Sequence, residues 1–271
     1  MSKIKKYIYL IITIVLLFGV AYSAYQLEVS NREYVKEKKV RQELAEYKPR
    51  LVVDNEEVSE VVESQGAKEN DSSKPTEKVV NQSILDLQER NADVVGWITI
   101  FGTQIDYPFL WADDYSTYLR SDINGERSTA GSIFMDYRCE KNFQGAHSIL
   151  FGHNMNNGSM FGEIPRFRER TFFLEHQDGY IYLPNENLKL KAIACMVAES
   201  SDAEVYGVAD TDNQKERFIE VLKEKDIHGG ESMPEDLSIK DRFVLLSTCS
   251  YEYDEARTVV VYRIVDEASK V

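Results

Sequence analysis

The sequence predicts a mostly β protein in which a closed or nearly closed β-barrel forms one domain of about 190 residues. The first observation is a series of short segments rich in branched and aromatic residues. The second is the alternation of polar Lys189 and Lys191 with apolar Leu190 and Ala192, which is typical of a half-buried strand. The third is that only a few helical segments interrupt the strands, and no internal repeat is present.

The expected strands follow one another along the whole C-terminal part of the chain. In chain order they cover residues 96–102, 104–110, 131–137, 147–153, 179–184, 188–200, 242–249 and 257–265. The last two are separated by a short polar connection, which predicts antiparallel neighbours joined by a loop.

Helical segments are expected at four places between or before the strands. They are a segment that begins near residue 81, and residues 113–120, 159–167 and 211–226. The last is the clearest, because Phe218, Val221 and Leu222 recur at helical spacing. Thr211 or Asp212 can cap its start.

An uncharged apolar segment, residues 7–27, follows Lys3, Lys5 and Lys6 at the N-terminus. At about 1.5 Å per residue, roughly twenty helical residues span the ~30 Å hydrocarbon core of a membrane. Lysines on the N-terminal side favour a single-pass helix with its N-terminus inside and the body outside the cell. The alternative is a cleaved signal peptide, because residues 21–23 weakly resemble a cleavage site. The length of the apolar segment favours an uncleaved anchor in the cell membrane.

Three regions are expected along the chain. Residues 1–28 form the membrane anchor, residues 29–80 a juxtamembrane stalk and flexible linker, and residues 81–271 an extracellular folded domain. The stalk is charged and helix-permissive, whereas the centre of the linker is polar and lacks aromatic residues. The formal net charge of -14 argues against a nucleic-acid-binding function, which would need a basic face.

One cysteine and one arginine stand at the ends of the last two expected strands. Cys249 ends one strand, and Arg257 begins the next, eight positions later. Because adjacent strands lie about 4.8 Å apart, the two side chains can meet. The thiolate would then be a nucleophile, with the guanidinium stabilising it or a substrate oxyanion. The alternative is a buried structural cysteine beside a surface arginine, and this segment alone leaves both interpretations open.

A nucleophilic cysteine needs a base, and the chain contains four histidines. His153 follows an apolar strand where Gly152 lets the backbone turn, so it can reach a neighbouring strand end. His147 begins the same strand, where a capping or solvated role is expected. His176 and His228 lie in polar connections and are expected to be solvated loop residues.

Motifs at several separated places carry one family resemblance. "LSTC" at 246–249, followed by Arg257, and "GHNM" at 152–155 resemble the segments around the catalytic cysteine and histidine of sortases, the cysteine transpeptidases of Gram-positive cell surfaces. "AGSIFMDYR" at 130–138 and "GWITIFGTQIDYPFL" at 96–110 resemble class B sortases in particular. The resemblance covers the chain from about residue 81 to the end.

The resemblance implies a closed eight-stranded β-barrel with peripheral helices and an N-terminal helix packed on it. It also implies that Cys249 is the nucleophile, that His153 is the acid and base, and that Arg257 stabilises the oxyanion or positions the substrate. The family commonly has Thr where this chain has Leu245, a departure that concerns strand packing more than chemistry. The residues expected to bind substrate are Thr248, Ser247, Tyr251 and Asn154.

The implied reaction is transpeptidation of secreted proteins that carry a C-terminal sorting motif. The enzyme would cleave the motif between Thr and Gly, hold the protein as a thioester and pass it to an amine of a lipid-linked peptidoglycan precursor. The alternatives are a pilus-polymerising enzyme that uses a pilin lysine, a hydrolytic cysteine peptidase and a non-catalytic surface scaffold. No cofactor or metal is expected, because class B sortases are not generally calcium-dependent and the acidic residues lack the spacing of a calcium loop.

Overall fold

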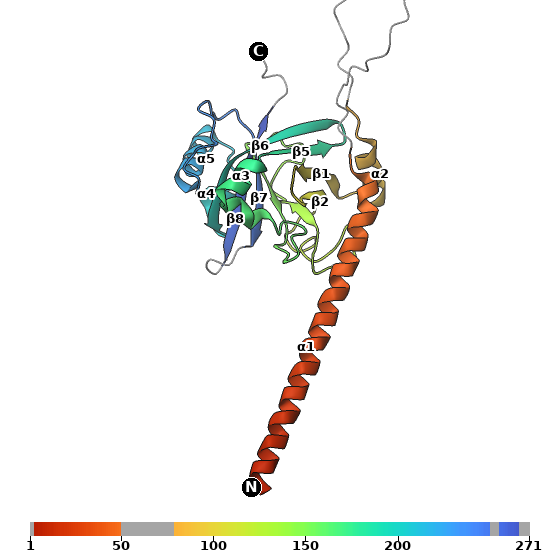
Figure 1. Ribbon diagram of the computed structural model, residues 1–271. Helices are drawn as coiled ribbons and strands as arrows, with labels where there is room; N and C mark the ends of the chain where they lie inside the picture. Colours follow the sequence, from red (N-terminus) through yellow and green to blue (C-terminus); the bar gives the residue numbers. More distant parts are fainter. Residues whose placement is uncertain (1–2, 50–78, 250–254, 266–271) are drawn as a thin grey trace, which may run out of the picture.

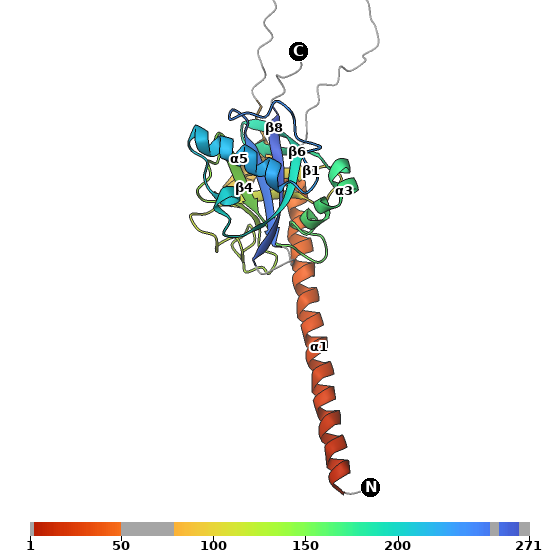
Figure 2. The same cartoon turned by 90° about the vertical axis from the view of Figure 1, so that its left-hand side faces the viewer.

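The computed structural model describes residues 3–49, 79–249 and 255–265, and its body is a closed β-barrel (Figures 1 and 2). Around the barrel the strands follow the order β1-β2-β3-β4-β7-β8-β6-β5. They are β1 (Val94–Ile100), β2 (Asp106–Trp111), β3 (Ile133–Met135), β4 (His147–Phe151), β5 (Asp178–Leu183), β6 (Glu186–Glu199), β7 (Phe243–Cys249) and β8 (Ala256–Val265). The predicted barrel is therefore confirmed, and every expected strand segment overlaps one of these strands.

The pairing of three strands decides which side chains meet at one end of the barrel. β4 runs parallel to β7 and pairs Phe151 with Ser247. β7 and β8 are antiparallel and pair Cys249 with Arg257. The C-terminal ends of β4 and β7 and the start of β8 therefore lie side by side.

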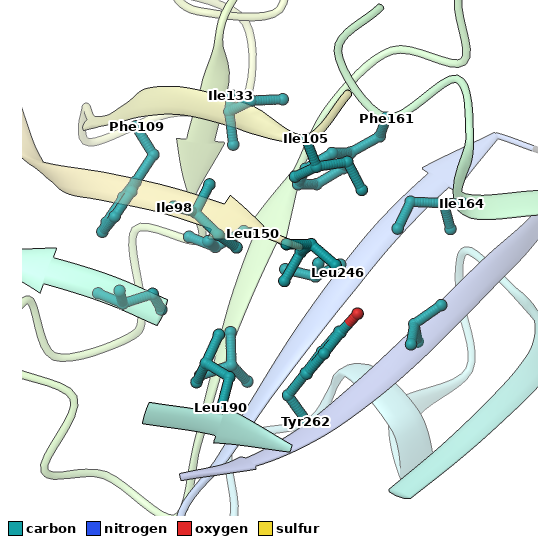
Figure 3. Close-up of a cluster of buried hydrophobic side chains, with 14 of the residues drawn as sticks. Ile98, Ile105, Phe109, Ile133, Leu150, Phe161, Ile164, Leu190, Leu246 and Tyr262 are labelled. Carbon is teal, nitrogen blue, oxygen red and sulfur yellow. The ribbon is translucent and has the colours of Figure 1, made fainter. Parts of the chain in front are cut away.

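Apolar side chains fill the barrel interior (Figure 3). Ile98, Phe109, Leu150 and Leu246 are fully buried there, and full burial of each such side chain contributes about 1.5–3 kcal/mol. Because side chains alternate along a strand, Leu245 points to the outer face of the sheet and is buried in a second apolar layer.

Helix α5 (Asp212–Lys225) covers this second layer and confirms the clearest helix of the sequence. Its cap is Thr211, whose side chain accepts a hydrogen bond from the backbone of Gln214 while the Gln214 side chain accepts one from the Thr211 backbone. Helix α2 (Gln82–Arg90) confirms the helix expected after residue 81. The shorter helical elements are α3 (Arg170–Glu175), α4 (Ala203–Tyr206) and the 3₁₀ turns η1 (Ala45–Tyr47) and η2 (Ile164–Arg168).

Two of the expected helices need correction. Residues 113–120 form turns, because the Asp114 carboxylate accepts hydrogen bonds from the backbone N–H groups of Ser116 and Thr117. Such local bonding competes with a helix. Of residues 159–167 only the end is helical, in η2, since Met160 has a φ of 53° and cannot belong to a right-handed helix.

Helix α1 (Lys3–Leu44) runs without a break from the apolar segment into the expected stalk (Figure 1). Its apolar part is exposed, and within the described ranges it is the one helix long and apolar enough to cross a membrane. Its last turns pack on the barrel, where Leu44 is buried together with Ile84 and Leu87 of α2. Most of the expected flexible linker, residues 50–78, lies outside the described residues.

Candidate active site

A pocket of about 490 Å³ lies where β4 and β7 end and β8 begins. Cys249, His153 and Arg257, the three residues expected to be catalytic, all line it. Aromatic side chains and the connection after β6, from Ser200 to Gly207, complete much of its wall. The site is therefore assembled from several separate segments of the chain, from Tyr115 to Arg257.

Cys249 and Arg257 face each other across β7 and β8. They are direct partners in the strand register, and Nη1 of Arg257 lies 2.7 Å from Sγ of Cys249. Both side chains are partly exposed, so a substrate in the pocket can reach them. A guanidinium at this position can stabilise negative charge on the sulfur or on a substrate oxygen beside it.

His153 reaches the same pocket from the end of β4. The parallel register pairs Phe151 with Ser247, two positions before His153 on one segment and before Cys249 on the other, and both side chains line the pocket. Nε2 of His153 lies 2.8 Å from the carbonyl oxygen of Leu119. A carbonyl can only accept a hydrogen bond, so Nε2 carries a proton in this arrangement.

Hydrogen bonds tie the end of β4 to the end of β7. Oγ1 of Thr248 donates to the carbonyl of Gly152 over 2.7 Å, and Nδ2 of Asn154 donates to the carbonyl of Cys249 over 2.9 Å. Neither Thr248 nor Asn154 lines the pocket, although both were expected to bind substrate. Their side chains connect the end of β7, which carries Cys249, to the segment after β4, which carries His153. Gly152 is needed for close packing, since a Cβ there would lie 2.5 Å from the side chain of Ile133.

Ser247 lines the pocket, but its hydroxyl already has a partner. Its Oγ lies 2.9 Å from Oη of Tyr206, and both side chains are buried. Burial raises the pKa of Tyr206 to about 12, so its phenol is neutral at physiological pH. Tyr251, the remaining residue expected at the substrate, lies outside the described residues.

A set of side chains that sequence reasoning did not bring together joins two walls of the pocket. Asp136, just after β3, is fully buried and accepts a bidentate contact from Arg138 at 2.9 and 2.6 Å. Oη of Tyr115 donates to the same carboxylate at 3.1 Å. Nη2 of Arg138 also donates to the carbonyl of Tyr206 at 2.9 Å. Arg138 therefore balances the buried charge and fixes both wall segments.

The sequence signal for this set is the run "MDYR" at 135–138, where an acid and an arginine follow a strand directly. The signal shows the pair itself. It does not show that Tyr115 and Tyr206, from two other connections, share it.

His147 is buried, contrary to the capping or solvated role expected for it. Its ring stacks on Phe218 of α5 with the ring centroids 4.5 Å apart, and burial lowers its pKa to about 4. His176 and His228 are half-buried rather than solvated, and each has a ring nitrogen at 2.7 and 2.8 Å, respectively, from a backbone carbonyl. None of these three histidines lines the pocket described above.

The other two cysteines are poor nucleophiles. Cys195 is fully buried in β6, and burial raises its pKa well above the usual range. Burial also raises the pKa of Cys139 to about 11. Among the described residues, no group of three or more His, Cys, Asp or Glu side chains is placed to hold a metal ion. Cys249 is therefore the thiol that is placed for chemistry.

Comparison with known proteins places this pocket in a family. No family model matches the chain. Sortase B of Listeria monocytogenes is 33% identical over 191 residues, which cover 69% of this chain and 75% of that protein. The crystal structure of sortase B from Bacillus anthracis matches with a TM-score of 0.69 and 28% identity, covering 87% of this chain and 99% of that one.

A Streptococcus pyogenes class B sortase involved in pilus biogenesis matches with a TM-score of 0.59 and 32% identity, covering 66% of this chain and 96% of that one. In these relatives, as here, the body is a barrel with few helices. The sequence identity of these matches, and the share of the chain that they cover, are greater than a shared fold alone requires. The chain belongs to the sortase family, with its similarity to class B, and is a cysteine transpeptidase.

Proposed function

We propose that Cys249, His153 and Arg257 are the catalytic residues and that this transpeptidase acts on secreted proteins at the outer face of the membrane. The proposal is carried by the 2.7 Å contact between Nη1 of Arg257 and Sγ of Cys249, in a pocket that His153 also lines. Acyl transfer through a thioester needs a nucleophile, a proton carrier and a group that stabilises the oxyanion. All three have a candidate in this pocket.

In the first step the Cys249 thiolate attacks the scissile carbonyl carbon, and the electron pair of the C=O bond moves to oxygen. The Arg257 guanidinium stabilises that oxyanion. The carbonyl then re-forms as a thioester while the C–N bond breaks, and protonated His153 gives its proton to the leaving amine.

In the second step an incoming amine attacks the thioester. Neutral His153 takes a proton from that amine, and the sulfur leaves as a thiolate. One amide has been broken and another formed, with no net change in protons and no redox partner. Both ionised forms are regenerated, so the enzyme is ready for the next substrate.

We infer that the substrate is a C-terminal sorting motif cleaved between Thr and Gly, and that the acceptor is an amine of a lipid-linked peptidoglycan precursor. The family membership supports this substrate class, because sortases act on proteins with sorting signals. The apolar segment of α1 supports the location, since a single-pass anchor with the N-terminus inside places the barrel where secreted proteins emerge.

A pilin lysine is the second candidate acceptor. The likeness to the Streptococcus pyogenes class B sortase involved in pilus biogenesis favours it. The chemistry at Cys249 is the same in both cases, so only the second step distinguishes them.

Trapping of the thioester tests the proposed nucleophile. Full-length protein incubated with a sorting-signal peptide and no added amine should gain the mass of the acyl fragment on Cys249, read by peptide mapping. Cys249→Ala should abolish both the adduct and peptide cleavage. Cys139→Ala removes a half-buried thiol outside the pocket and should leave both unchanged. Cleavage that persists in Cys249→Ala would refute Cys249 as the nucleophile, whereas an unmodified protein that neither forms the adduct nor cleaves the peptide would favour a non-catalytic scaffold.

The acceptor is identified by adding amines to the same reaction. A glycine-type amine should appear in the product if the enzyme anchors proteins to the wall. A pilin domain should appear instead if the enzyme polymerises pili. Hydrolysis that neither amine diverts would indicate a cysteine peptidase.

A further inference from the structure

Helix α1 is fastened to the barrel by polar contacts along its last four turns. Oε2 of Glu33 accepts a hydrogen bond from Oγ1 of Thr129 at 3.1 Å. Nζ of Lys36 donates to the carbonyl of Arg127 at 2.9 Å and lies 3.0 Å from a carboxylate oxygen of Glu126. All of these barrel residues belong to the connection between β2 and β3.

Further along α1, the contacts are with other segments of the protein. Nη1 of Arg41 donates to Oε1 of Gln104 at 3.2 Å, and Leu44 is buried against α2. Just beyond the helix, Nζ of Lys48 donates to Asp106 at 2.6 Å. The contacts from Glu33 to Leu44 span about 17 Å of helix, so α1 cannot pivot about a single point.

The part of the β2–β3 connection that binds α1 is also hydrogen-bonded to a segment that lines the active site. The backbone N–H of Ser128 donates to the carbonyl of Arg120 at 2.9 Å. The preceding residue, Leu119, lines the pocket and accepts the hydrogen bond from Nε2 of His153. One connection thus touches the first docked turn of α1 and orients the histidine.

The first docked turn of α1 therefore lies beside the connection that also reaches the pocket. Figures 1 and 2 show from two sides that β8 begins on the side of the barrel nearer the N-terminal part of α1 and runs away from it. Arg257 is the second residue of β8. The catalytic end of the barrel thus faces the place where a membrane around the apolar segment would lie.

The distance along α1 between the apolar segment and the first contact with the barrel sets the height of the pocket above the membrane. The apolar segment ends at Leu27, and the first contact with the barrel is at Glu33. Six residues at about 1.5 Å each give roughly 9 Å. The headgroup layer of each leaflet is about 5–8 Å thick. The contact between α1 and the β2–β3 connection therefore lies at the outer edge of the headgroup layer.

We propose that α1 fixes the distance between the membrane and the pocket as well as anchoring the protein, and we call this role the ruler. Its rigid docking holds the pocket at the membrane surface and facing it, so that the thioester is resolved by amines held at that surface. This inference rests on the proposed function, because it requires residues 7–27 to span the membrane. It adds that the acceptor is selected by height, and that a flexible tether would not have this property.

Insertions in α1 test the ruler in the full-length protein. Seven or fourteen residues of Glu-Ala-Ala-Ala-Lys type, inserted after Ser30, lift the barrel by about 10 or 21 Å as a continued helix. The matched control is an insertion of fourteen Gly and Ser residues, whose root-mean-square span of about 20 Å lets the barrel return to the surface. All variants are expressed with a reporter protein bearing a sorting signal, in a Gram-positive host that lacks its own class B enzyme.

Two measurements are made on each variant. The first is the fraction of reporter covalently linked to the wall in cells. The second is cleavage of a sorting-signal peptide, with a soluble glycine-type amine, by the detergent-solubilised enzyme. We expect the longer helical insertion to lower wall linkage about tenfold or more, the shorter one to lower it less, and the Gly/Ser insertion to restore most of it. Peptide cleavage should be the same in all.

The outcomes separate the ruler from the proposed function. Equal wall linkage in the unmodified chain and in the longer helical variant overturns the ruler alone. A matching loss of detergent activity in the helical variants also overturns it, because the insertion would then act on the barrel itself. An unmodified chain that cleaves the peptide but never links the reporter to the wall rejects the proposed wall acceptor, and with it the selection by height.

Discussion

At the scale of single residues, the contact between Cys249 and Arg257 follows from strand register. The two residues are opposite each other because β7 and β8 pair antiparallel. Leu245, where the family commonly has Thr, lies on the same face of β7 and is fully buried beneath α5. It is four residues from Cys249, or about 13 Å along the strand, and does not line the pocket. The departure therefore alters packing and leaves the site unchanged.

Replacement of Arg257 by Lys keeps the charge but removes the planar guanidinium whose Nη1 reaches Sγ of Cys249. We expect Arg257→Lys to lower kcat/KM for a sorting-signal peptide by about 100-fold, the usual scale for loss of one oxyanion donor. Arg263→Lys is the matched control, since Arg263 lies on the same strand and pairs with Asp241 outside the pocket. No loss in the first variant, or an equal loss in both, would contradict the role of Arg257.

Arg138 acts on the pocket walls and not on the reacting atoms, so it is a positioning residue. Lysine cannot make the bidentate contact with Asp136 and also reach the carbonyl of Tyr206. We expect Arg138→Lys to raise KM about fivefold, which corresponds to roughly 1 kcal/mol, and to change kcat little.

Two further measurements separate positioning from general disruption in Arg138→Lys. The rate of Cys249 alkylation by iodoacetamide reports on the catalytic contact and should stay within about twofold of the unmodified protein. Arg170→Lys, at a surface pair with Glu231, should leave KM unchanged. If kcat and the alkylation rate fall while KM rises, Arg138 does more than position the walls of the pocket, and its assignment as a positioning residue is wrong.

At the scale of elements, β4 carries one histidine at each end, and the two have opposite environments. His153 lies past its C-terminal end in the pocket, whereas His147 begins it under α5. Burial keeps His147 neutral in the folded protein, with a pKa of about 4, while an unfolded histidine titrates near 6.5. The unfolded chain therefore binds a proton first as the pH falls. The stability associated with this site is present above about pH 6.5 and is lost as the pH falls toward 4.

Substitution of His147 by Phe keeps an aromatic ring against Phe218 and removes the titration. Between pH 7 and pH 5 the unmodified protein should lose about 2 kcal/mol more unfolding free energy than His147→Phe. Denaturant unfolding at the two pH values measures this difference, and it does not depend on which protein is more stable at pH 7. Parallel pH dependences in the two proteins would show that His147 is not the acid-sensitive group.

At the scale of the whole molecule, α1 and the barrel form one body whose interface contains a buried acid. Glu37 is only 8% exposed, and its Oε1 has no hydrogen-bond partner among the described residues. Burial raises the pKa of this carboxyl, although the charge of Arg41 opposes the rise. A raised pKa in the folded state means that the charged form is disfavoured by docking. The loss of stability caused by ionised Glu37 is absent at pH values below the ordinary pKa of a glutamate. It develops as the pH rises from that value through the raised pKa of the folded state.

Glu37→Gln should therefore stabilise the docked helix at pH 7 and have less effect near pH 4. Denaturant unfolding of the full chain in detergent at both pH values measures the gain. Glu46→Gln, at an exposed position just after α1, is the control and should change neither value. A gain of the same size at both pH values would mean that the effect is not the buried charge.

Much of the fold and the centre of the site could be predicted because the signals are local. Alternation along β6 and the capped apolar face of α5 are readable in a window of ten to fifteen residues. Cys249 and Arg257 could be paired because a short connection between two strands constrains their register. The turn at Asp114 was missed because its short polar side chain competes locally with a helix that the surrounding residues would otherwise allow.

The remaining features depend on closure of the barrel, which brings distant segments together. The burial of His147 requires α5, which begins 65 positions later (212 − 147). The wall set of Asp136, Arg138, Tyr115 and Tyr206 draws on three separate connections. Thr248 and Asn154, which are predicted to bind substrate, also connect the ends of β4 and β7 through their side chains, and this contact is not visible in the sequence.

The sequence by itself predicted a β-barrel after an apolar N-terminal segment, a cysteine and an arginine at facing ends of one strand pair, and a histidine that follows another strand. Hydrophobic periodicity and short connections are enough for these placements, because they act between near neighbours in the chain, whereas the catalytic roles of the three side chains came from the family resemblance. Only the tertiary structure decided where the pocket faces and what holds its walls. Those features come from contacts between α1, the β2–β3 connection and the strand ends, and such contacts exist only after the barrel has closed and buried the groups between them.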